Sequence, residues 1–525
     1  MAATDSEPIL NGPRDDWPRL DVHLSTRLVR SLVSMGDRIV QVYPEAGGGA
    51  QEASAQWLLQ RAAAEDSVLR VGAGDMVVAC CSWSPHLAPL MLATIARDAI
   101  FVPLNPDQPT EDLRRLLVRL SPAAVQCEQA ALRAVSAASP VQPQPLGAAA
   151  PVPAADVQRF VTQQLSRPPP KGEEARRPVI ALHSSGTTGD PKTILHSQSS
   201  FSALLDVIRR KDSNYREGDV FVINTPFFWV TQVVATLMSM DFPVKVVAVK
   251  GMDPAAFRDA IQKYQATTVL TPPHVWTRLT KMEDSTHEQF RSLRFPVSSG
   301  STLDSSKAAL LHERLGLRMA QWYGTSEVLP IAGITKGERG ALPPTGSVGR
   351  INAYTQARVV DVETGRTLGP GQEGELHFRG PTACNAVGPD QWFNTGDIGH
   401  YEPAGWIFVV DRVKELIKFQ GIHVSPSEIE SVLVSHPAVA DAVVLGKPHP
   451  TDTEHPTGFV VLRPGASVTR QQLVDLVADK LSSYPYKHLR GGVHFVSSIP
   501  RTVVGKVKRA NLLQTLTAQA EQTAQ

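Results

Sequence analysis

The chain has 525 residues, and its 52 Lys and Arg residues nearly balance its 51 Asp and Glu residues, which leaves a formal net charge of +1. At about 100–200 residues per domain, this length predicts two to four folding units. An apolar content of 42% suffices for a large core and excludes wholesale disorder. The near-neutral charge excludes nucleic acid as the main partner, because phosphate backbones require clustered positive charge.

Cysteine usage and the chain ends predict a cytoplasmic protein without a membrane span. The four cysteines show no metal-ligand spacing and fit a reducing compartment. The N-terminal segment is acidic and lacks the apolar core of a secretory signal. Residues 88–104 form the most apolar stretch, but Arg97 and Asp98 interrupt it and it is too short to span a bilayer. The final Thr-Ala-Gln is not a peroxisomal tripeptide.

Strand-type runs and helical stripes alternate along the first half of the chain. Strands are predicted at 76–81 and 100–104, and helices at 87–96 and 111–120. Pro-rich stretches follow and predict surface connectors at 139–153 and 168–170.

The alternation resumes after these connectors. Strands are predicted at 179–182, 220–223, 244–249 and 268–270. A helical stripe carries Phe201, Leu204, Leu205 and Ile208, and further helices are predicted at 254–264 and 305–315, the last with Asp304 as N-cap and Gly316 as its end. This order implies mainly parallel sheets covered by helices, with ligands at the carboxyl ends of the strands.

The sequence pattern changes near Asp411. A compact α/β unit is predicted beyond it, with helices at 426–434 and 470–481 and strands at 442–445, 458–462 and 493–496. We therefore predict an N-terminal domain at 1–410 and a C-terminal domain at 411–525, joined by a hinge near 411–414.

The most informative segment is SSGTTGDPK, residues 184–192, which follows a predicted strand and is expected to precede a helix. Its glycines allow backbone N–H groups to converge on an anion, its hydroxyls add donors, and Lys192 adds a positive charge. A plain polar turn is the simplest alternative. A Walker A loop is another, but Pro191 stands where the second glycine belongs and removes one N–H donor.

Five further motifs follow this loop in order. They are YGTSE at 323–327, GEL at 374–376, TGD at 395–397, DRVKELIK at 411–418 and GKVKR at 505–509. Together they resemble the signatures of the acyl-adenylate-forming superfamily, closest in pattern to acyl-CoA synthetases and 4-coumarate–CoA ligase-like enzymes, over about residues 57–513. The resemblance implies an α/β fold: a large N-terminal domain with helix-covered, mainly parallel sheets and a small barrel-like part, and a small mobile C-terminal α/β domain.

The resemblance also implies a reaction. A carboxylic acid and ATP would give an acyl-AMP and pyrophosphate, and the acyl group would then pass to the thiol of coenzyme A. The C-terminal domain would rotate between these half-reactions. The implied cofactors are ATP, Mg²⁺ and coenzyme A as co-substrate.

Residue roles follow from the matched motifs. Lys506 would bridge the carboxylate and phosphate oxygens, and Glu327 with Thr187 would hold Mg²⁺. Asp397 would accept the ribose hydroxyls, and Tyr323 would lie near adenine unless it is an aromatic core residue. The implied nucleotide-binding set comprises Ser184, Ser185, Gly186, Thr187, Thr188, Gly189, Lys192, Gly300, Ser301, Tyr323, Gly324, Thr325, Asp397, Arg412 and Lys506.

The C-terminal segment also matches residues of the thiol half-reaction. Lys414, at the hinge, and Lys418 and Gly421, on the presented segment, are the candidates. A solvated face explains the two lysines nearly as well.

The implied acid pocket comprises Phe228, Trp229, Gly300 and Gly324. Trp229 stands where relatives often have His, which changes the pocket wall or the gate to the thiol. Gly324 replaces the Trp of acetate-restricted relatives, and residues 227–232 lack the Asp that pairs an amino group. We therefore predict an apolar medium-chain or aromatic acid.

Three other functions remain as alternatives. The enzyme could load the phosphopantetheine thiol of a carrier protein, act as a luciferase-like oxygenase, or serve as a non-catalytic acyl or nucleotide sensor. The charged residues at all the matched catalytic positions argue against the sensor. The sequence leaves the oligomeric state open.

Overall fold

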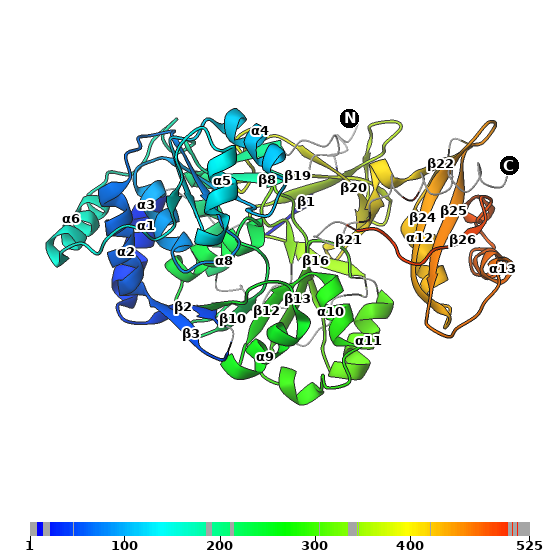
Figure 1. Cartoon of the computed structure of the whole chain (residues 1–525). Coiled ribbons are helices and arrows are strands. Elements are labelled where there is room, and N and C mark those ends of the chain that lie inside the picture. The colour runs from blue at the N-terminus through cyan, green and yellow to red at the C-terminus, as the bar shows by residue number, and fades with distance from the viewer. Residues whose placement is uncertain are drawn as a thin grey trace, which may run out of the picture.

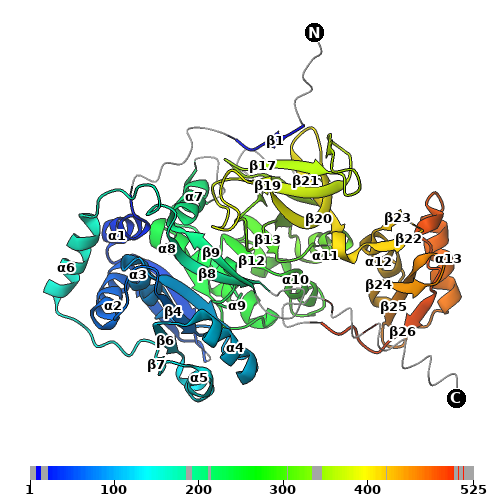
Figure 2. The same cartoon turned by 90° about the horizontal axis from the view of Figure 1, so that it is seen from above.

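The computed structural model describes residues 8–13, 22–45, 47–184, 192–210, 215–303, 305–333, 344, 346–420, 422–501, 507 and 512. The chain forms a large N-terminal part built on three sheets and a smaller C-terminal part built on one (Figures 1 and 2). Within these ranges, no helix combines the length and apolarity needed to cross a bilayer.

The first sheet has six strands in the order β7-β6-β4-β5-β8-β9. They are β4 (Met76–Cys80), β5 (Ile100–Leu104), β6 (Ala124–Cys127), β7 (Gln144–Pro145), β8 (Pro178–Ser184) and β9 (Lys192–Ser197). All neighbours pair in parallel except β8 and β9. Helices α4 (Thr110–Leu120) and α5 (Leu132–Ala138) cover one face, where Leu113 and Leu117 share a buried cluster with Val102.

The second sheet has seven strands in the order β14-β13-β12-β10-β11-β2-β3, parallel except at β3. They are β2 (Ile39–Pro44), β3 (Ala50–Ser54), β10 (Val220–Ile223), β11 (Lys245–Ala248), β12 (Thr268–Thr271), β13 (Phe295–Ser299) and β14 (Ala320–Trp322). Three helices pack on its outer face around the buried Trp276: α9 (Pro254–Tyr264), α10 (Pro273–Leu279) and α11 (Ser305–Leu315).

One hydrophobic cluster joins the inner faces of both sheets. It includes residues of six helices: α1 (Leu24–Met35), α2 (Ala55–Val68), α3 (Leu87–Ala96), α6 (Ala154–Leu165), α7 (Gln198–Arg209) and α8 (Val230–Asp241). The predicted helices at 87–96, 254–264 and 305–315 coincide with α3, α9 and α11.

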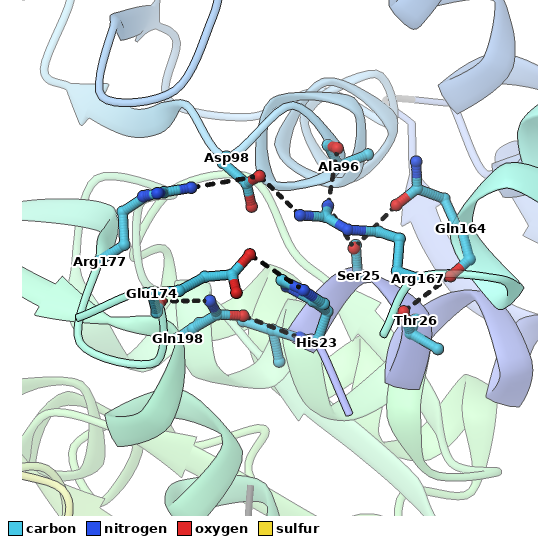
Figure 3. Close-up of polar contacts among 11 residues, drawn as sticks. His23, Ser25, Thr26, Ala96, Asp98, Gln164, Arg167, Glu174, Arg177 and Gln198 are labelled. Carbon is cyan, nitrogen blue, oxygen red and sulfur yellow. Dashed lines mark hydrogen bonds and ion pairs between the residues drawn. The ribbon is translucent and has the colours of Figure 1, made fainter. Parts of the chain in front are cut away.

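A polar network fixes the ends of these helices (Figure 3). His23 Nε2, just before α1, lies 3.4 Å from a carboxylate oxygen of Glu174, and the Gln198 side chain donates to the Glu174 carbonyl at 2.7 Å. Arg167, after α6, donates to Asp98 at 2.6 Å. Burial is the main cause of a lowered pKa for His23, so this imidazole is neutral near pH 7. The network thereby anchors the start of α7, the helix that follows β9.

The third sheet is antiparallel and has eight strands. They are β1 (Leu10–Asn11), β15 (Ala332–Gly333), β16 (Ser347–Ile351), β17 (Gln356–Val360), β18 (Thr367–Leu368), β19 (Gly374–Arg379), β20 (Phe393–Tyr401) and β21 (Trp406–Arg412). This sheet supplies the barrel-like part that the resemblance implies, and the expected fold class is confirmed.

The short helical turn η4 (Val413–Glu415) leads into the C-terminal part. That part contains β22 (Ile417–Phe419), β23 (Ile422–Val424), α12 (Pro426–Val434), β24 (Val439–His449), β25 (Thr453–Leu462), α13 (Arg470–Lys480) and β26 (Val493–Phe495). Asp411, near the end of β21, accepts hydrogen bonds from the Ser425 hydroxyl at 2.7 Å and from Ser427 N at 3.2 Å. Its carboxylate therefore links the third sheet to the start of α12.

Candidate functional site

The candidate phosphate loop connects β8 to β9. Its central residues, Ser185, Gly186, Thr187, Thr188 and Gly189, lie outside the described residues. At its base, Ser184 and Lys192 are antiparallel partners. The expected helix directly after the loop is wrong, because 192–197 alternates buried and less buried positions and returns as a strand. A Walker A loop runs from a strand into a helix, so this hairpin excludes that alternative.

Three expected nucleotide-binding residues meet where β14 and β21 end beside the middle of β20. Asp397 on β20 pairs in register with Arg412 on β21, and Tyr323 directly follows β14. The Tyr323 hydroxyl donates to Asp397 Oδ2 at 2.5 Å, and Arg412 Nε lies 3.0 Å from Asp397 Oδ1. Asp397 is only 4% exposed. An ionised carboxylate only accepts hydrogen bonds, so this group suits donors such as hydroxyls.

The surroundings of Tyr323 keep its phenol protonated. Burial, and next the negative charge of Asp397, raise the pKa of Tyr323 well above its usual value. Its ring packs against Phe378, with 5.9 Å between the ring centroids. The ring of Tyr323 therefore packs on the core while its hydroxyl reaches Asp397, and a place near adenine stays a prediction.

Glu327 lies in the turn that follows Tyr323. Val328 N donates to the Thr325 hydroxyl at 3.0 Å, and Cys384 N donates to the Glu327 carbonyl at 2.7 Å. Within the part of the chain that the structure describes, the Glu327 carboxylate has no ion-pair partner. A single half-buried carboxylate of this kind suits Mg²⁺, which takes one or two carboxylates together with phosphate oxygens. Thr187, the expected second contact, lies outside the described residues.

His196 on β9 is a site residue that sequence reasoning missed. Its Nε2 lies 2.7 Å from the Ser326 carbonyl, an acceptor, so Nε2 carries the proton and donates. Burial lowers the pKa of His196 to about 4, and the ring is neutral. The bond ties the strand leaving the phosphate loop to the residue before Glu327. The alternation along the strand could have predicted that His196 is buried. It could not have predicted the partner, Ser326, which lies 130 residues further along the chain.

An apolar cavity of about 140 Å³ adjoins Tyr323, Gly324 and Thr325. Its lining also includes the apolar residues Leu204, Ile208, Phe221, Val230, Val234 and Met238. None of its described lining residues is acidic.

Only Gly324 of the expected acid-pocket residues lines this cavity. Trp229 is the N-cap of α8, and Phe228 precedes it, so the wall is formed instead by Val230, Val234 and Met238, which share a face of α8. Gly300 has a φ of +90° in an exposed turn, and Ser301 beside it is also exposed.

The residues expected in the thiol half-reaction lie in η4, in β22 and in the chain beyond. Lys414 in η4 and Lys418 in β22 are both exposed. Gly421 and the expected catalytic Lys506 lie outside the described residues. The structure thus brings together Tyr323, Asp397 and Arg412, with Thr325 and Glu327 in the adjoining turn.

Comparisons with known proteins identify the family of this chain. Residues 39–386 match the family described as AMP-binding enzyme, and residues 428–506 match the AMP-binding enzyme C-terminal domain. A probable 4-coumarate–CoA ligase 1 of Dictyostelium discoideum is 33% identical over 349 residues, which are 64% of this chain and 62% of that protein. The peroxisomal OPC-8:0-CoA ligase 1 of Arabidopsis thaliana is 29% identical over 392 residues, 70% of each chain.

The fold also matches solved structures. ATP-bound MatB from Rhodopseudomonas palustris superimposes with a TM-score of 0.80, covering 93% of this chain and 98% of that one at 24% identity. At that identity, the likeness concerns the fold alone. The sequence match to the Dictyostelium protein spans less than two thirds of that relative's length.

Proposed function

Since this chain belongs to the AMP-binding enzyme family, we propose that it is an acid–CoA ligase. It would activate a carboxylic acid with ATP, release pyrophosphate, and transfer the acyl group to coenzyme A.

The observation that carries the proposal is the position of residues 323–325. This segment borders the apolar cavity, and its Tyr323 also holds the Asp397 carboxylate. An acid with its apolar end in the cavity would present its carboxylate next to a nucleotide whose ribose hydroxyls bind Asp397. Recognition of the acid and of ATP would therefore meet at one segment.

The chemistry requires little beyond positioning and charge stabilisation. A carboxylate oxygen would attack the α-phosphorus, and the bond from that phosphorus to pyrophosphate would break. Glu327 and Thr187 would hold Mg²⁺, which neutralises phosphate charge, and Lys506 would bridge carboxylate and phosphate oxygens. The thiolate of coenzyme A would then attack the acyl carbon and release AMP, with Lys414, Lys418 and Gly421 presented for this second step.

The cavity favours a compact apolar acid. At about 140 Å³ it is close to the cavity of about 150 Å³ that takes up benzene in a well-studied protein interior. Without an acidic residue in its described lining, it offers no partner for a substrate ammonium group. We therefore favour an aromatic acid or an apolar medium-chain acid.

The test is a panel of acids incubated with ATP and Mg²⁺, with and without coenzyme A, and with products identified by mass. Benzoate-type and medium-chain acids should give acyl-AMP without coenzyme A and thioester with it, while acetate and α-amino acids should react poorly. Lys506→Ala is the matched control and should form little acyl-AMP. The absence of acyl-AMP from every acid contradicts adenylation, and acyl transfer only to a phosphopantetheinylated carrier protein contradicts the choice of thiol.

Filling the cavity should change acid selectivity. Val234→Phe adds an aromatic ring to the cavity wall, so kcat/KM for an aromatic acid should fall by at least about tenfold, with a smaller loss for a short acid. Initial rates of pyrophosphate release measure both. Val118→Phe, on the exposed face of α4, should leave the ratio of the two rates unchanged. An equal loss for both acids in Val234→Phe would contradict the placement of the acid in this cavity.

A further inference from the structure

Two histidines and an aspartate meet at the tip of the β24–β25 hairpin, in the C-terminal part. The potential ligand atoms of His449, Asp452 and His455 all lie within 4.8 Å of one another. His455 Nε2 is 2.7 Å and His449 Nδ1 is 3.3 Å from the same atom, Asp452 Oδ2. We propose that these three side chains bind a divalent zinc ion.

The donor set suits zinc. Two imidazole nitrogens and one carboxylate oxygen are ligands that Zn²⁺ takes at about 2.0–2.2 Å, which places neighbouring tetrahedral ligands roughly 3.4 Å apart. Asp452 Oδ2 lies 2.7 Å from His455 Nε2 and 3.3 Å from His449 Nδ1, and both distances are somewhat shorter than this separation. The side chains are 36%, 21% and 17% exposed for His449, Asp452 and His455, so solvent can supply the fourth ligand.

A second contact orients the carboxylate. The Gln420 side chain donates to Asp452 Oδ1 at 2.7 Å, and Gln420 N donates to the Asp452 carbonyl at 3.0 Å. These bonds leave Oδ2 directed at the imidazoles, in the way that outer hydrogen bonds orient metal-binding carboxylates. Thr453, inside the cluster, has a φ of +67°, a backbone conformation that a β-branched residue rarely adopts and that persists where ligand sites impose it.

Binding requires one ring to turn. The imidazoles of His449 and His455 are stacked, with centroids 3.7 Å apart and planes inclined by 17°. Ring nitrogens coordinate in the ring plane, so nearly parallel rings cannot share an ion until one rotates about χ2, a torsion with a broad range. His449, the more exposed ring, is the one with room to rotate.

A bound ion would brace the hairpin against β22. Phe419 of β22 pairs with Thr453, and Lys418 N donates to a Glu454 carboxylate oxygen at 2.8 Å. Removal of the ion should loosen these contacts without touching Asp397 or Tyr323.

The experiment uses the full chain without an affinity tag, stripped of metal and titrated with Zn²⁺ against a chromogenic zinc chelator. We expect one competing zinc ion per chain, and apparent zinc affinity at least about tenfold weaker in His449→Ala, His455→Ala and Asp452→Asn. Gln420→Ala should weaken binding by about tenfold through the carboxylate it orients. His312→Ala, on the exposed surface of α11, is the matched control and should bind as the wild type does.

A second measurement guards against misfolded variants. Zinc should raise the thermal midpoint of the wild type and of His312→Ala, but not that of His455→Ala, while the metal-free midpoints of all three should agree. Equal zinc affinity in the wild type and the His455→Ala and Asp452→Asn variants overturns the proposal. So does a wild type that binds no zinc.

Discussion

At the scale of single residues, the candidate site depends on the contacts of one buried carboxylate, that of Asp397. One of its oxygens accepts a hydrogen bond from the Tyr323 hydroxyl, and the other pairs with Arg412. Because the Tyr323 phenol is held protonated, it donates to Asp397 at any ordinary pH. The carboxylate is thereby fixed in orientation before a ligand arrives, which lowers the entropy lost on binding.

Removing the Tyr323 hydroxyl should weaken ATP binding. In Tyr323→Phe, Asp397 loses a charge-assisted hydrogen bond, and KM for ATP should rise by about tenfold with a smaller change in kcat. Pyrophosphate release at varied ATP concentration measures both. Tyr264→Phe, at a half-buried tyrosine that ends α9 and has a buried hydroxyl, should leave KM for ATP unchanged. An unchanged KM for ATP in Tyr323→Phe would show that the hydrogen bond from Tyr323 to Asp397 does not contribute to ATP binding.

At the scale of elements, β9 connects the phosphate loop to the turn of Glu327. The connection is the His196 bond to the Ser326 carbonyl. Because the pKa of His196 is about 4 in the folded protein and about 6.5 in an unfolded chain, the unfolded state binds more protons between these values. His196 therefore destabilises the fold as the pH falls below about 6.5 toward 4.

This titration gives a measurable pH dependence. From pH 7 to pH 5, neutral His196 should account for a loss of about 2 kcal/mol in unfolding free energy. His196→Gln keeps an N–H for Ser326 but does not titrate. Between the two pH values, the unfolding free energy of this variant should therefore fall less than that of the wild type, by that amount. Urea unfolding at both pH values measures the difference. Burial also lowers the pKa of His183 to about 4. Both proteins contain His183, so its contribution to the pH dependence cancels in the comparison. His312→Gln should behave as the wild type, and an equal loss in His196→Gln would contradict the buried neutral ring.

The elements also show which structure a sequence can specify by itself. Helix α9 could be predicted to the residue because Pro254 starts it and the Asp253 carboxylate caps it at Ala256 N. The resemblance implied the third sheet as a barrel-like part, but its individual strands were not predicted. Strands as short as β15 and β18 contain too few residues to show a period. β9 was misread because the glycine-rich loop before it resembles the start of a helix.

The site itself was predictable only through resemblance. Tyr323 and Asp397 are 74 residues apart, and no local pattern brings them together. The acid pocket is predicted to include Phe228 and Trp229, whereas the cavity beside Tyr323 is lined from α8 by Val230 and Val234. Contacts of this kind depend on how helices pack across the whole N-terminal part, which periodicity does not specify.

At the scale of the whole molecule, the link between the two parts passes through Asp411. Its carboxylate accepts bonds from Ser425 and Ser427 at the start of α12, while its backbone continues β21. The following η4 carries the exposed Lys414, and the exposed Lys418 follows in β22. A hinge restrained in this way is loosened by loss of one side chain.

Asp411→Ala should therefore expose the linker to protease. Loss of a cap of this kind costs about 1 kcal/mol, so cleavage by trypsin at Lys414 and Lys418 should be about fivefold faster. Timed digestion followed by mass analysis of the two fragments measures this rate. Asp441→Ala, which breaks a pair with Arg501 within the C-terminal part, is the control and should not accelerate cleavage at these lysines. Equal cleavage rates in the Asp411→Ala and Asp441→Ala variants would show that the Asp411 carboxylate does not restrain the linker.

The division of the cavity between one helix and one turn has an evolutionary consequence. Val230, Val234 and Met238 of α8 line the cavity that we propose for the acid. Residues 323–325 border the same cavity, and Tyr323 also binds Asp397, which we propose for the nucleotide. A lineage could therefore exchange its preferred acid through changes in α8 and leave the nucleotide machinery intact. Substitutions that change the preferred acid would then accumulate in α8, while residues 323–325 and Asp397 stay constant.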